Sequence, residues 1–175
     1  MQHLTIALRA VSATALTGGL AFTGTATATA EPNTGSSADT NALAGALSNG
    51  YGLDNCTPQE LTATGELAEL LCGQNADSSG PGSGVYALFS DSTNLAASFS
   101  STIQDVTLTA CGDAGQSPTP WHQGSSNQPA GQVACGNYTT YATLTWTTDA
   151  KNVLGHLTAS DDDVDSLYQW WRTNG

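Results

Sequence analysis

The stretch GQVACGNYTTYATLTWTTDAKNVLGHLTAS, residues 131–160, decides the fold class of this 175-residue chain. Apolar side chains alternate with Tyr and Thr over residues 141–147, which is the two-residue period of a β-strand. Gly136-Asn137 and the segment 148–152 have the composition of turns, and an apolar run follows the second of them. The stretch therefore predicts a three-stranded antiparallel meander.

The segments that flank the meander predict one more central strand and two helices. GVYALFSD, residues 84–91, has apolar side chains on both faces, as in a strand covered on both sides. Residues 90–106 and 161–172 carry apolar side chains every three or four positions, the period of an amphipathic helix. In the second helix this stripe includes Trp171 but not its neighbour Trp170. ELAELLC, residues 66–72, fits either a strand or a helical turn. We therefore expect an α+β fold with an antiparallel sheet of four to five strands, two main helices packed on it, and two disulfides.

The beginning of the chain has the pattern of an export signal. One positive charge precedes an apolar run, and Ala28-Thr29-Ala30 matches the small-x-small cleavage pattern. We expect residues 1–30 to be a signal peptide that is cleaved near Ala30, residues 31–41 to be a disordered mature N-terminus, and residues 42–175 to form a single α+β domain. The expected location is extracellular or in the cell envelope, without a transmembrane segment.

Four cysteines lie at Cys56, Cys72, Cys111 and Cys135. In an exported chain an even number of cysteines predicts disulfides, and four cysteines allow three pairings. We favour Cys56–Cys72 with Cys111–Cys135, because each pair closes a local loop. No Cys-x-x-Cys motif occurs and no histidine lies near either pair, so we expect no zinc site.

The charge of the chain excludes one class of function. Fifteen Asp and Glu residues against three Lys and Arg give a formal net charge of −12 at pH 7. Such a surface repels phosphate backbones, so nucleic-acid binding is not expected. No phosphate loop, dinucleotide fingerprint or haem motif occurs, so we expect no cofactor.

The long loop over residues 112–130 is the first place to look for function, since loops of this length in a compact domain are commonly functional. It carries Trp121 and His122, which are candidates for ligand or partner contact or simply pack the loop. Trp170, beside the helix stripe, is the third candidate. A hydrolase would need His122 or His156 next to a serine and a carboxylate, and no Gly-x-Ser-x-Gly motif supports it.

The aspartates of DDDVD, residues 161–165, invite a calcium interpretation because carboxylate oxygens are hard ligands. They lack the spacing of an EF-hand and the glycine at its turn. Capping of the following helix, with Ser160 and Asp163 as a capping-box-like pair, explains them better. We therefore expect no metal site here.

Seven short segments together resemble a known family: GYGLDNCT, LCGQN, GVYALFSD, TPWHQ, GQVACGNY, LTWTTDAKNVLG and LYQWW. In this order they resemble a small exported domain of unknown function, common in mycobacteria and their relatives. Similar segments occur in the extracytoplasmic part of some actinobacterial serine/threonine kinases. The resemblance spans residues 43–172 and implies paired cysteines and the order strand, helix, long loop, meander, helix. It carries over no catalytic residue, and we expect neither a kinase domain nor a membrane anchor in this chain.

These observations favour a secreted, non-catalytic binding or sensor-like module that engages an envelope component or partner. Its expected contacts are Trp121, His122 and Trp170. The first alternative is a small secreted hydrolase that uses His122 or His156. The second is a protein-interaction module or surface antigen whose exposed aromatic side chains contact a partner. A pocket at the long loop would favour the binding module.

Overall fold

The computed structural model describes residues 31–175 of the chain. The signal peptide expected over residues 1–30 lies outside the described residues. Residues Pro32–Gly175 pack as one unit. Among the described residues, no helix is both long enough and apolar enough to span a membrane.

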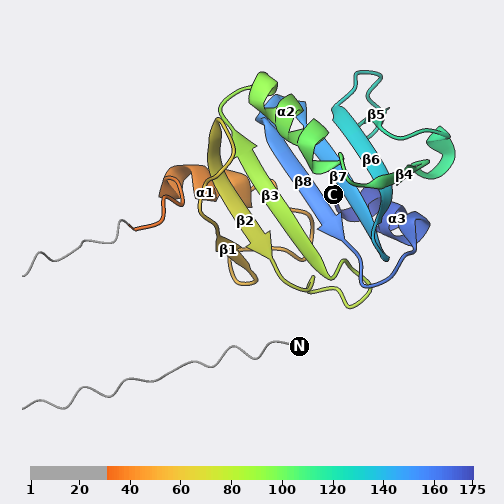
Figure 1. Cartoon of the computed structure of the whole chain (residues 1–175), viewed down its shortest axis with the longest axis horizontal. Helices are drawn as coiled ribbons and strands as arrows, with labels where there is room; N and C mark the ends of the chain where they lie inside the picture. The colour runs from red at the N-terminus through yellow and green to blue at the C-terminus, as the bar shows by residue number, and fades with distance from the viewer. Residues whose placement is uncertain (1–30) are drawn as a thin grey trace, which may run out of the picture. The chain divides into compact units, whose positions relative to one another are not determined.

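An eight-stranded antiparallel sheet forms the centre of this unit (Figure 1). In chain order the strands are β1 (Cys56–Pro58), β2 (Glu66–Cys72), β3 (Ser83–Phe89), β4 (Thr107–Thr109), β5 (Thr119–Trp121), β6 (Gly131–Tyr138), β7 (Tyr141–Thr148) and β8 (Val153–Thr158). Their order in space is β1-β2-β3-β8-β7-β6-β4, and β5 also pairs with β6. Strand β8 therefore lies between β3 and β7 and joins the meander to the central strand.

The prediction of four to five strands was wrong, because the described sheet has eight. Strands β1, β4 and β5 contain three residues each, which is too short to show a two-residue period. They form because a longer neighbour offers free backbone groups: β1 pairs with β2, and β4 and β5 both pair with β6. The ambiguous segment 66–72 is a strand, β2.

Three helices pack on the sheet, not the two that were expected. They are α1 (Ser37–Ala44), α2 (Ser92–Thr102) and α3 (Val164–Asn174), and two short 3₁₀ turns are η1 (Gly112–Ala114) and η2 (Asp149–Lys151). Figure 1 shows α2 in front of the sheet and α1 and α3 behind it.

Helix α1 overlaps the segment 31–41 for which the composition predicted disorder. The Ser36 hydroxyl accepts a hydrogen bond from the Asp39 backbone N–H at 3.1 Å and so caps the helix. Leu43, near the other end of the helix, is completely buried against the sheet. The cap and this one buried side chain hold a polar segment in place that has no amphipathic stripe of its own.

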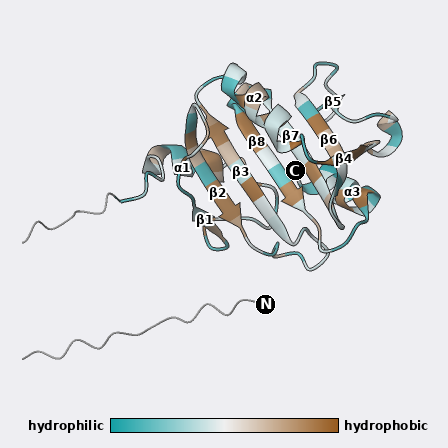
Figure 2. Ribbon diagram, viewed as in Figure 1, coloured by the Kyte–Doolittle hydropathy of each residue, from teal (hydrophilic) through white to brown (hydrophobic). Residues whose placement is uncertain are grey.

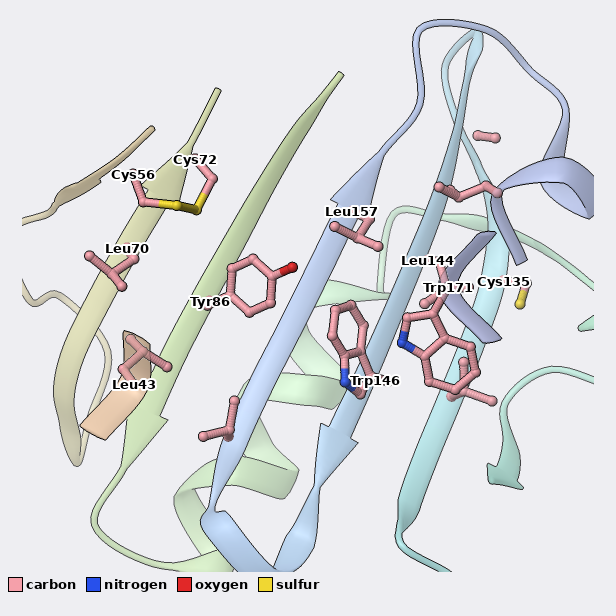
Figure 3. Packing of buried hydrophobic residues seen from close by; sticks show 14 of the residues in the cluster. Leu43, Cys56, Leu70, Cys72, Tyr86, Cys135, Leu144, Trp146, Leu157 and Trp171 are labelled. Carbon is pink, nitrogen blue, oxygen red and sulfur yellow. A yellow bond between two sulfur atoms is a disulfide. The ribbon is translucent and has the colours of Figure 1, made fainter. Parts of the chain in front are cut away.

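Each face of the sheet has its own apolar core. The larger core lies between the sheet and helices α1 and α3, and Figure 3 shows its labelled side chains, among them Tyr86, Trp146 and Trp171. The smaller core lies under α2 and contains Phe89, Leu95, Phe99, Ala87, Ala134 and Leu154. Hydropathy accordingly changes in bands along the strands (Figure 2). The apolar character of both faces of β3 follows from this double covering.

The meander is confirmed as β6, β7 and β8, but its first turn is not at Gly136-Asn137. Strand β6 continues to Tyr138, and the chain turns at Thr139, whose φ is +56°. A side chain at Gly136 would collide with Val106 and with the backbone of Thr107 in β4. Gly136 therefore permits the close approach of a neighbouring strand, a role that cannot be distinguished locally from that of a turn glycine.

The two disulfides are Cys56–Cys72 and Cys111–Cys135, the pairs that the sequence analysis favoured. The first joins β1 to β2, where the two cysteines are direct cross-strand partners. The second joins the loop after β4 to β6. It thereby holds the start of the long loop, which contains β5, against the sheet.

Candidate functional site

A hollow of about 480 Å³ lies between the β5 segment and helix α3. We call it the aromatic hollow. It is lined by Ala114, Thr119, Pro120, Trp121, His122, Gln123, Gly124, Tyr168, Trp171, Arg172 and Gly175. Its size is within the range of small-ligand sites in proteins, roughly 300–1,000 Å³. Two of the three predicted contact residues, Trp121 and His122, are therefore placed at the hollow.

The indole of Trp121 is held in place by the sheet. Strand β5 pairs with β6 so that Trp121 lies opposite Gly131. The indole N–H donates a hydrogen bond to the backbone carbonyl of Thr147 over 2.7 Å. A side chain at Gly131 would collide with Thr147, so the glycine leaves β6 close to β7 there. Trp121 is half-buried, and its ring is a rigid wall of the hollow rather than a mobile loop side chain.

Trp171 adjoins Trp121 as a second wall residue and is also part of the larger core, as the helical stripe predicted. Its side chain is 5% exposed. Its ring centroid lies 5.4 Å from that of Trp121 in an edge-to-face arrangement, 5.7 Å from that of Trp146, and 5.9 Å from the stacked ring of Tyr168. Such contacts stabilise a cluster by about 0.5–1.5 kcal/mol each beyond burial, so the wall is stiff.

The indole N–H of Trp171 is buried without a hydrogen-bond acceptor among the described residues. The Nε1 edge of the ring lies against Gly175, which also lines the hollow. A buried donor without an acceptor costs about 1–3 kcal/mol. The N–H is therefore a cost to the fold, which the packing of the Trp171 ring against its aromatic neighbours offsets.

Arg172 brings the positive charge of the site. Its guanidinium carbon lies 6.0 Å from the centroid of the Tyr168 ring, within the range of a cation–π contact. No described carboxylate forms an ion pair with it. None of the described residues that line the hollow is Asp or Glu, whereas His122 and Gln123 add polar groups. The hollow thus combines aromatic walls with hydrogen-bond donors and one unpaired cation.

A second, smaller hollow of about 200 Å³ lies on another side of α3, and we call it the acidic hollow. Its lining includes Trp170, Asp161 and Asp163, together with Ser78, Ser79, Gly80, Pro81, Ala159, Ser160, Ser166 and Leu167. Trp170 donates its indole N–H to the Asp77 carboxylate over 3.3 Å. Trp170 is thus partly buried at this hollow and does not belong to the aromatic hollow that holds Trp121 and His122.

Asp77 is kept in its ionised form by three donors. The Ser79 backbone N–H and hydroxyl lower the pKa of Asp77 most, and the Trp170 indole N–H lowers it further. Hydrogen bonds to a carboxylate favour the charged form. The contact ties α3 to the loop between β2 and β3.

The aspartates of residues 161–165 begin helix α3, but not through the predicted Ser160–Asp163 pair. Asp163 is itself the N-cap: its carboxylate accepts hydrogen bonds from the Ser166 backbone N–H at 2.9 Å and from the Ser166 hydroxyl at 2.8 Å. These bonds lower the pKa of Asp163. Residues 31–175 contain no group of three or more His, Cys, Asp or Glu side chains arranged to hold a metal ion.

His156 lies on the same face of β8 as Leu154, which is the α2 face, and its ring nitrogens lie near threonine hydroxyls. Its Nδ1 is 2.8 Å from the Thr145 hydroxyl, and its Nε2 is 3.4 Å from the Thr158 hydroxyl. Burial lowers the pKa of His156 to about 4, so the imidazole is neutral at neutral pH. The hydroxyl groups around it are threonines of the sheet, and Thr145 is itself buried. His122 lies on an exposed loop position at the aromatic hollow.

A pair of glutamates on the α2 face is a feature that sequence reasoning missed. Glu69 pairs with Ala87 across β2 and β3, and it lies next to Glu66. Burial, then a hydrogen bond with Glu66 and the charge of Glu66, raise the pKa of Glu69 to about 7. Glu66 also accepts hydrogen bonds from the backbone N–H groups of Thr62 and Ala63, at 2.9 and 3.0 Å. Glu66 thus fixes the turn before β2.

Sequence reasoning found the loop side of the aromatic hollow but not its helix side. Trp171 was assigned to the core alone, and Tyr168 to the same stripe. Arg172 was not among the predicted contact residues, although it is one of only two basic residues after position 30. Its place beside the Trp171 stripe in an otherwise acidic chain was the signal that could have identified it.

Comparison of the chain with protein-family models, with curated proteins and with solved structures gives no match. The function is therefore argued from the geometry of the two hollows.

Proposed function

We propose that this protein is a secreted, non-catalytic binding module that takes a small ligand from the cell envelope in the aromatic hollow. The observation that carries the proposal is the hollow of about 480 Å³, whose walls include the aromatic side chains of Trp121, Tyr168 and Trp171. A concave site of this size with aromatic walls and a few polar groups is typical of small-ligand sites.

Two further observations support binding at this place. The wall residues Trp121 and Trp171 are positioned before any ligand arrives, the first by its bond to the Thr147 carbonyl and the second by its burial. Preorganised walls lower the entropic cost of binding. The expected location in an oxidising compartment is supported by the two disulfides. The resemblance to extracytoplasmic domains, proposed from the sequence alone, points to the same kind of role.

The test is a titration of the mature protein with lipid and glycan fractions of the producing organism's envelope. Binding is followed by calorimetry and by tryptophan emission. Two variants run in parallel: Trp121→Ala removes a wall of the aromatic hollow, and Trp170→Ala removes the same side chain from the acidic hollow. We expect saturable binding that survives in Trp170→Ala and falls at least tenfold in Trp121→Ala.

Equal binding by both variants would overturn the proposal, as would binding lost only in Trp170→Ala. The latter result would favour the interaction-module alternative. Near-ultraviolet circular dichroism of each variant shows whether a loss reflects the hollow or the fold. If Trp121→Ala does not fold, Trp121→Phe keeps the apolar wall but removes the bond to Thr147, and a smaller loss of affinity is then expected.

A further inference from the structure

We infer that the outer edge of strand β4 is a docking surface for an extended segment of a partner protein, in which basic and apolar residues alternate. The partner segment adds one strand to the sheet next to β4. This inference goes beyond the proposed function, because no residue of β4 lines the aromatic hollow.

Strand β4 is an edge of the sheet without the usual protection. It lies at the opposite end of the strand order from β1 and, among the described strands, pairs only with β6 (Figure 1). Its three residues, Thr107–Thr109, are all exposed, and none is charged or proline. Proline and charged side chains protect a strand edge, and the other short strands, β1 and β5, contain Pro58 and Pro120. The edge of β4 is therefore open to one more strand.

The two faces of the sheet continue to this edge, and β4 has side chains on both. Leu108 is the cross-strand partner of Gly136, and Thr109 is the partner of Cys135, whose side chain belongs to the larger core. Because side chains alternate along a strand, Thr109 lies on the side of the larger core and α3, and Leu108 lies on the side of α2. A strand added to β4 would have its own side chains alternate between the same two faces.

The face on the side of α2 is apolar at this edge. Leu108 is 38% exposed, and the cross-strand partners Tyr138 and Tyr141, at the end of the β6–β7 hairpin, are 54% and 47% exposed. These are three of the five large apolar side chains that are exposed among the described residues. Tyr138 lies two residues after Gly136 on β6 and therefore on the same face as Leu108. Apolar side chains of an added strand would cover this group.

The face on the side of α3 is acidic. Thr109 lines an open hollow of about 520 Å³, together with Ala110, Gly112, Asp162, Asp163, Val164 and Asp165. Asp163 caps α3, whereas Asp162 and Asp165 are exposed. None of the described residues that line this hollow is basic. Lys or Arg side chains on this face of an added strand would therefore be attracted.

Charge also decides between a foreign partner and a second copy of this chain. The chain has a formal net charge of −12, and pairing of β4 with the β4 of a second copy would bring the aspartates of both copies together. A segment with alternating basic and apolar residues meets opposite charge on one face and apolar side chains on the other. The partner that fits is therefore such a segment of another protein.

The test uses three blocked heptapeptides and the mature protein labelled with ¹⁵N. In the first peptide lysine and valine alternate, in the second the same residues form a block of lysines and a block of valines, and in the third glutamate replaces each lysine of the first. Calorimetry measures affinity, and the backbone N–H resonances are followed in each titration. We expect the alternating lysine peptide to bind about tenfold tighter than the block peptide, and the glutamate peptide not to bind. Resonances of β4 should move, and those of β1 should not.

Two double variants with the same change of charge test the acidic face. Asp162→Asn/Asp165→Asn removes two carboxylates beside β4 and keeps the cap of α3, and Asp54→Asn/Glu60→Gln removes two exposed carboxylates that flank β1. The first should weaken binding of the alternating lysine peptide about tenfold, as expected for the loss of two exposed ion pairs. The second should change this affinity less than about twofold.

Two leucine variants test the apolar face. Leu108→Ser should weaken binding of the alternating lysine peptide about fivefold, because apolar contact with the added strand is lost. Leu53→Ser makes the same change at another exposed leucine, outside the described strands, and should leave the affinity unchanged. Circular dichroism of each variant checks that the fold is retained.

Equal affinity for the alternating and the block peptide would overturn the inference, because charge attraction without strand pairing would explain it. Equal losses in the two double variants, or β4 resonances that do not move, would also overturn it. So would β4 resonances that move with protein concentration alone while sedimentation shows dimers, since a second copy would then occupy the edge. All these outcomes leave the proposed function intact, because its test is the loss of binding in Trp121→Ala.

Discussion

Trp170 and Trp171 are neighbours in the sequence, yet they lie on two sides of helix α3 and line two hollows of different chemistry. Trp170 is partly buried and donates its N–H to the Asp77 carboxylate. Trp171 is 5% exposed, and its N–H has no acceptor among the described residues. Adjacent helical residues point about 100° apart, so one step along the chain separates the two environments.

This difference shows how one helix can serve both stability and binding. The side with Trp171 belongs to the larger core, and the same residue lines the aromatic hollow. The side with Trp170 is a satisfied polar contact that ties the helix to the loop between β2 and β3. One side of α3 therefore both packs the core and forms a wall of the hollow, whereas the other side holds a loop in place.

The largest expected effect is the loss of the Trp171 side chain. Trp171→Ala should lower the free energy of unfolding by about 3–5 kcal/mol, because it leaves a cavity in the core. Trp170→Ala should lower it by about 1 kcal/mol, mainly through the lost hydrogen bond. Urea unfolding of both variants against the wild type measures the difference. Equal losses of unfolding free energy in the two variants would contradict the assignment of Trp171 to the core and of Trp170 to a partly exposed contact.

The disulfide Cys111–Cys135 offers a second test of the difference between the two sides of α3. It holds the start of the long loop, which lies on the side of Trp171 and not on that of Trp170. Replacing both cysteines by alanine releases a loop of 24 residues and should cost about 3 kcal/mol in the chain-entropy model. The Cys56→Ala/Cys72→Ala pair, with a separation of 16, should cost nearly as much. At a temperature where both remain folded, only the first pair should weaken binding in the aromatic hollow, as measured by calorimetry. Equal binding by both would contradict the role assigned to the tether.

The pH at which the tryptophan variants are compared matters because of Glu69. Its pKa rises from 4.5 to about 7 on folding, so the native state holds the proton more tightly. Stability from this group is full below pH 4.5 and is lost as the pH rises to about 7. Because Glu69 is only partly buried, solvent screens its charge, and we expect an effect of about 1 kcal/mol.

The measurement is the difference in unfolding free energy between the wild type and Glu69→Gln across this range. The difference is needed because His156, whose pKa is lowered to about 4, changes stability in the opposite direction as the pH rises. Glu60→Gln, which makes the same change at an exposed glutamate, is the matched control. A difference that does not depend on pH would show that Glu69 is not held protonated by Glu66 and burial.

The smallest expected effect separates the two indole N–H groups directly. Asp77 has a lowered pKa, so its carboxylate should remain ionised until the pH falls below 3.8. When it is protonated, the Trp170 N–H loses its charged acceptor, and its ¹⁵N–¹H resonance should shift upfield. The Trp171 resonance should not titrate there. Asp77→Asn should abolish the Trp170 titration, and a titration that persists in this variant would assign it to another carboxylate.

The sequence by itself determined the features that depend on local periodicity. The alternation over residues 141–147 identified β7, and the spacing of Leu167 and Trp171 identified the buried face of α3. These patterns are readable because the period of a strand or helix is a property of its own backbone. The two disulfide pairs were favoured for a similar reason, since each closes a local loop.

Only the tertiary structure decided the short strands and the site. β1, β4 and β5 exist because longer neighbours present free backbone groups, and three residues carry no period. The aromatic hollow joins Trp121 to Trp171, fifty positions apart, and whether Arg172 is paired depends on which carboxylates lie near it in space. Pairing and burial are relations between distant segments, so a local pattern can identify the residue types but not the partner that each one meets.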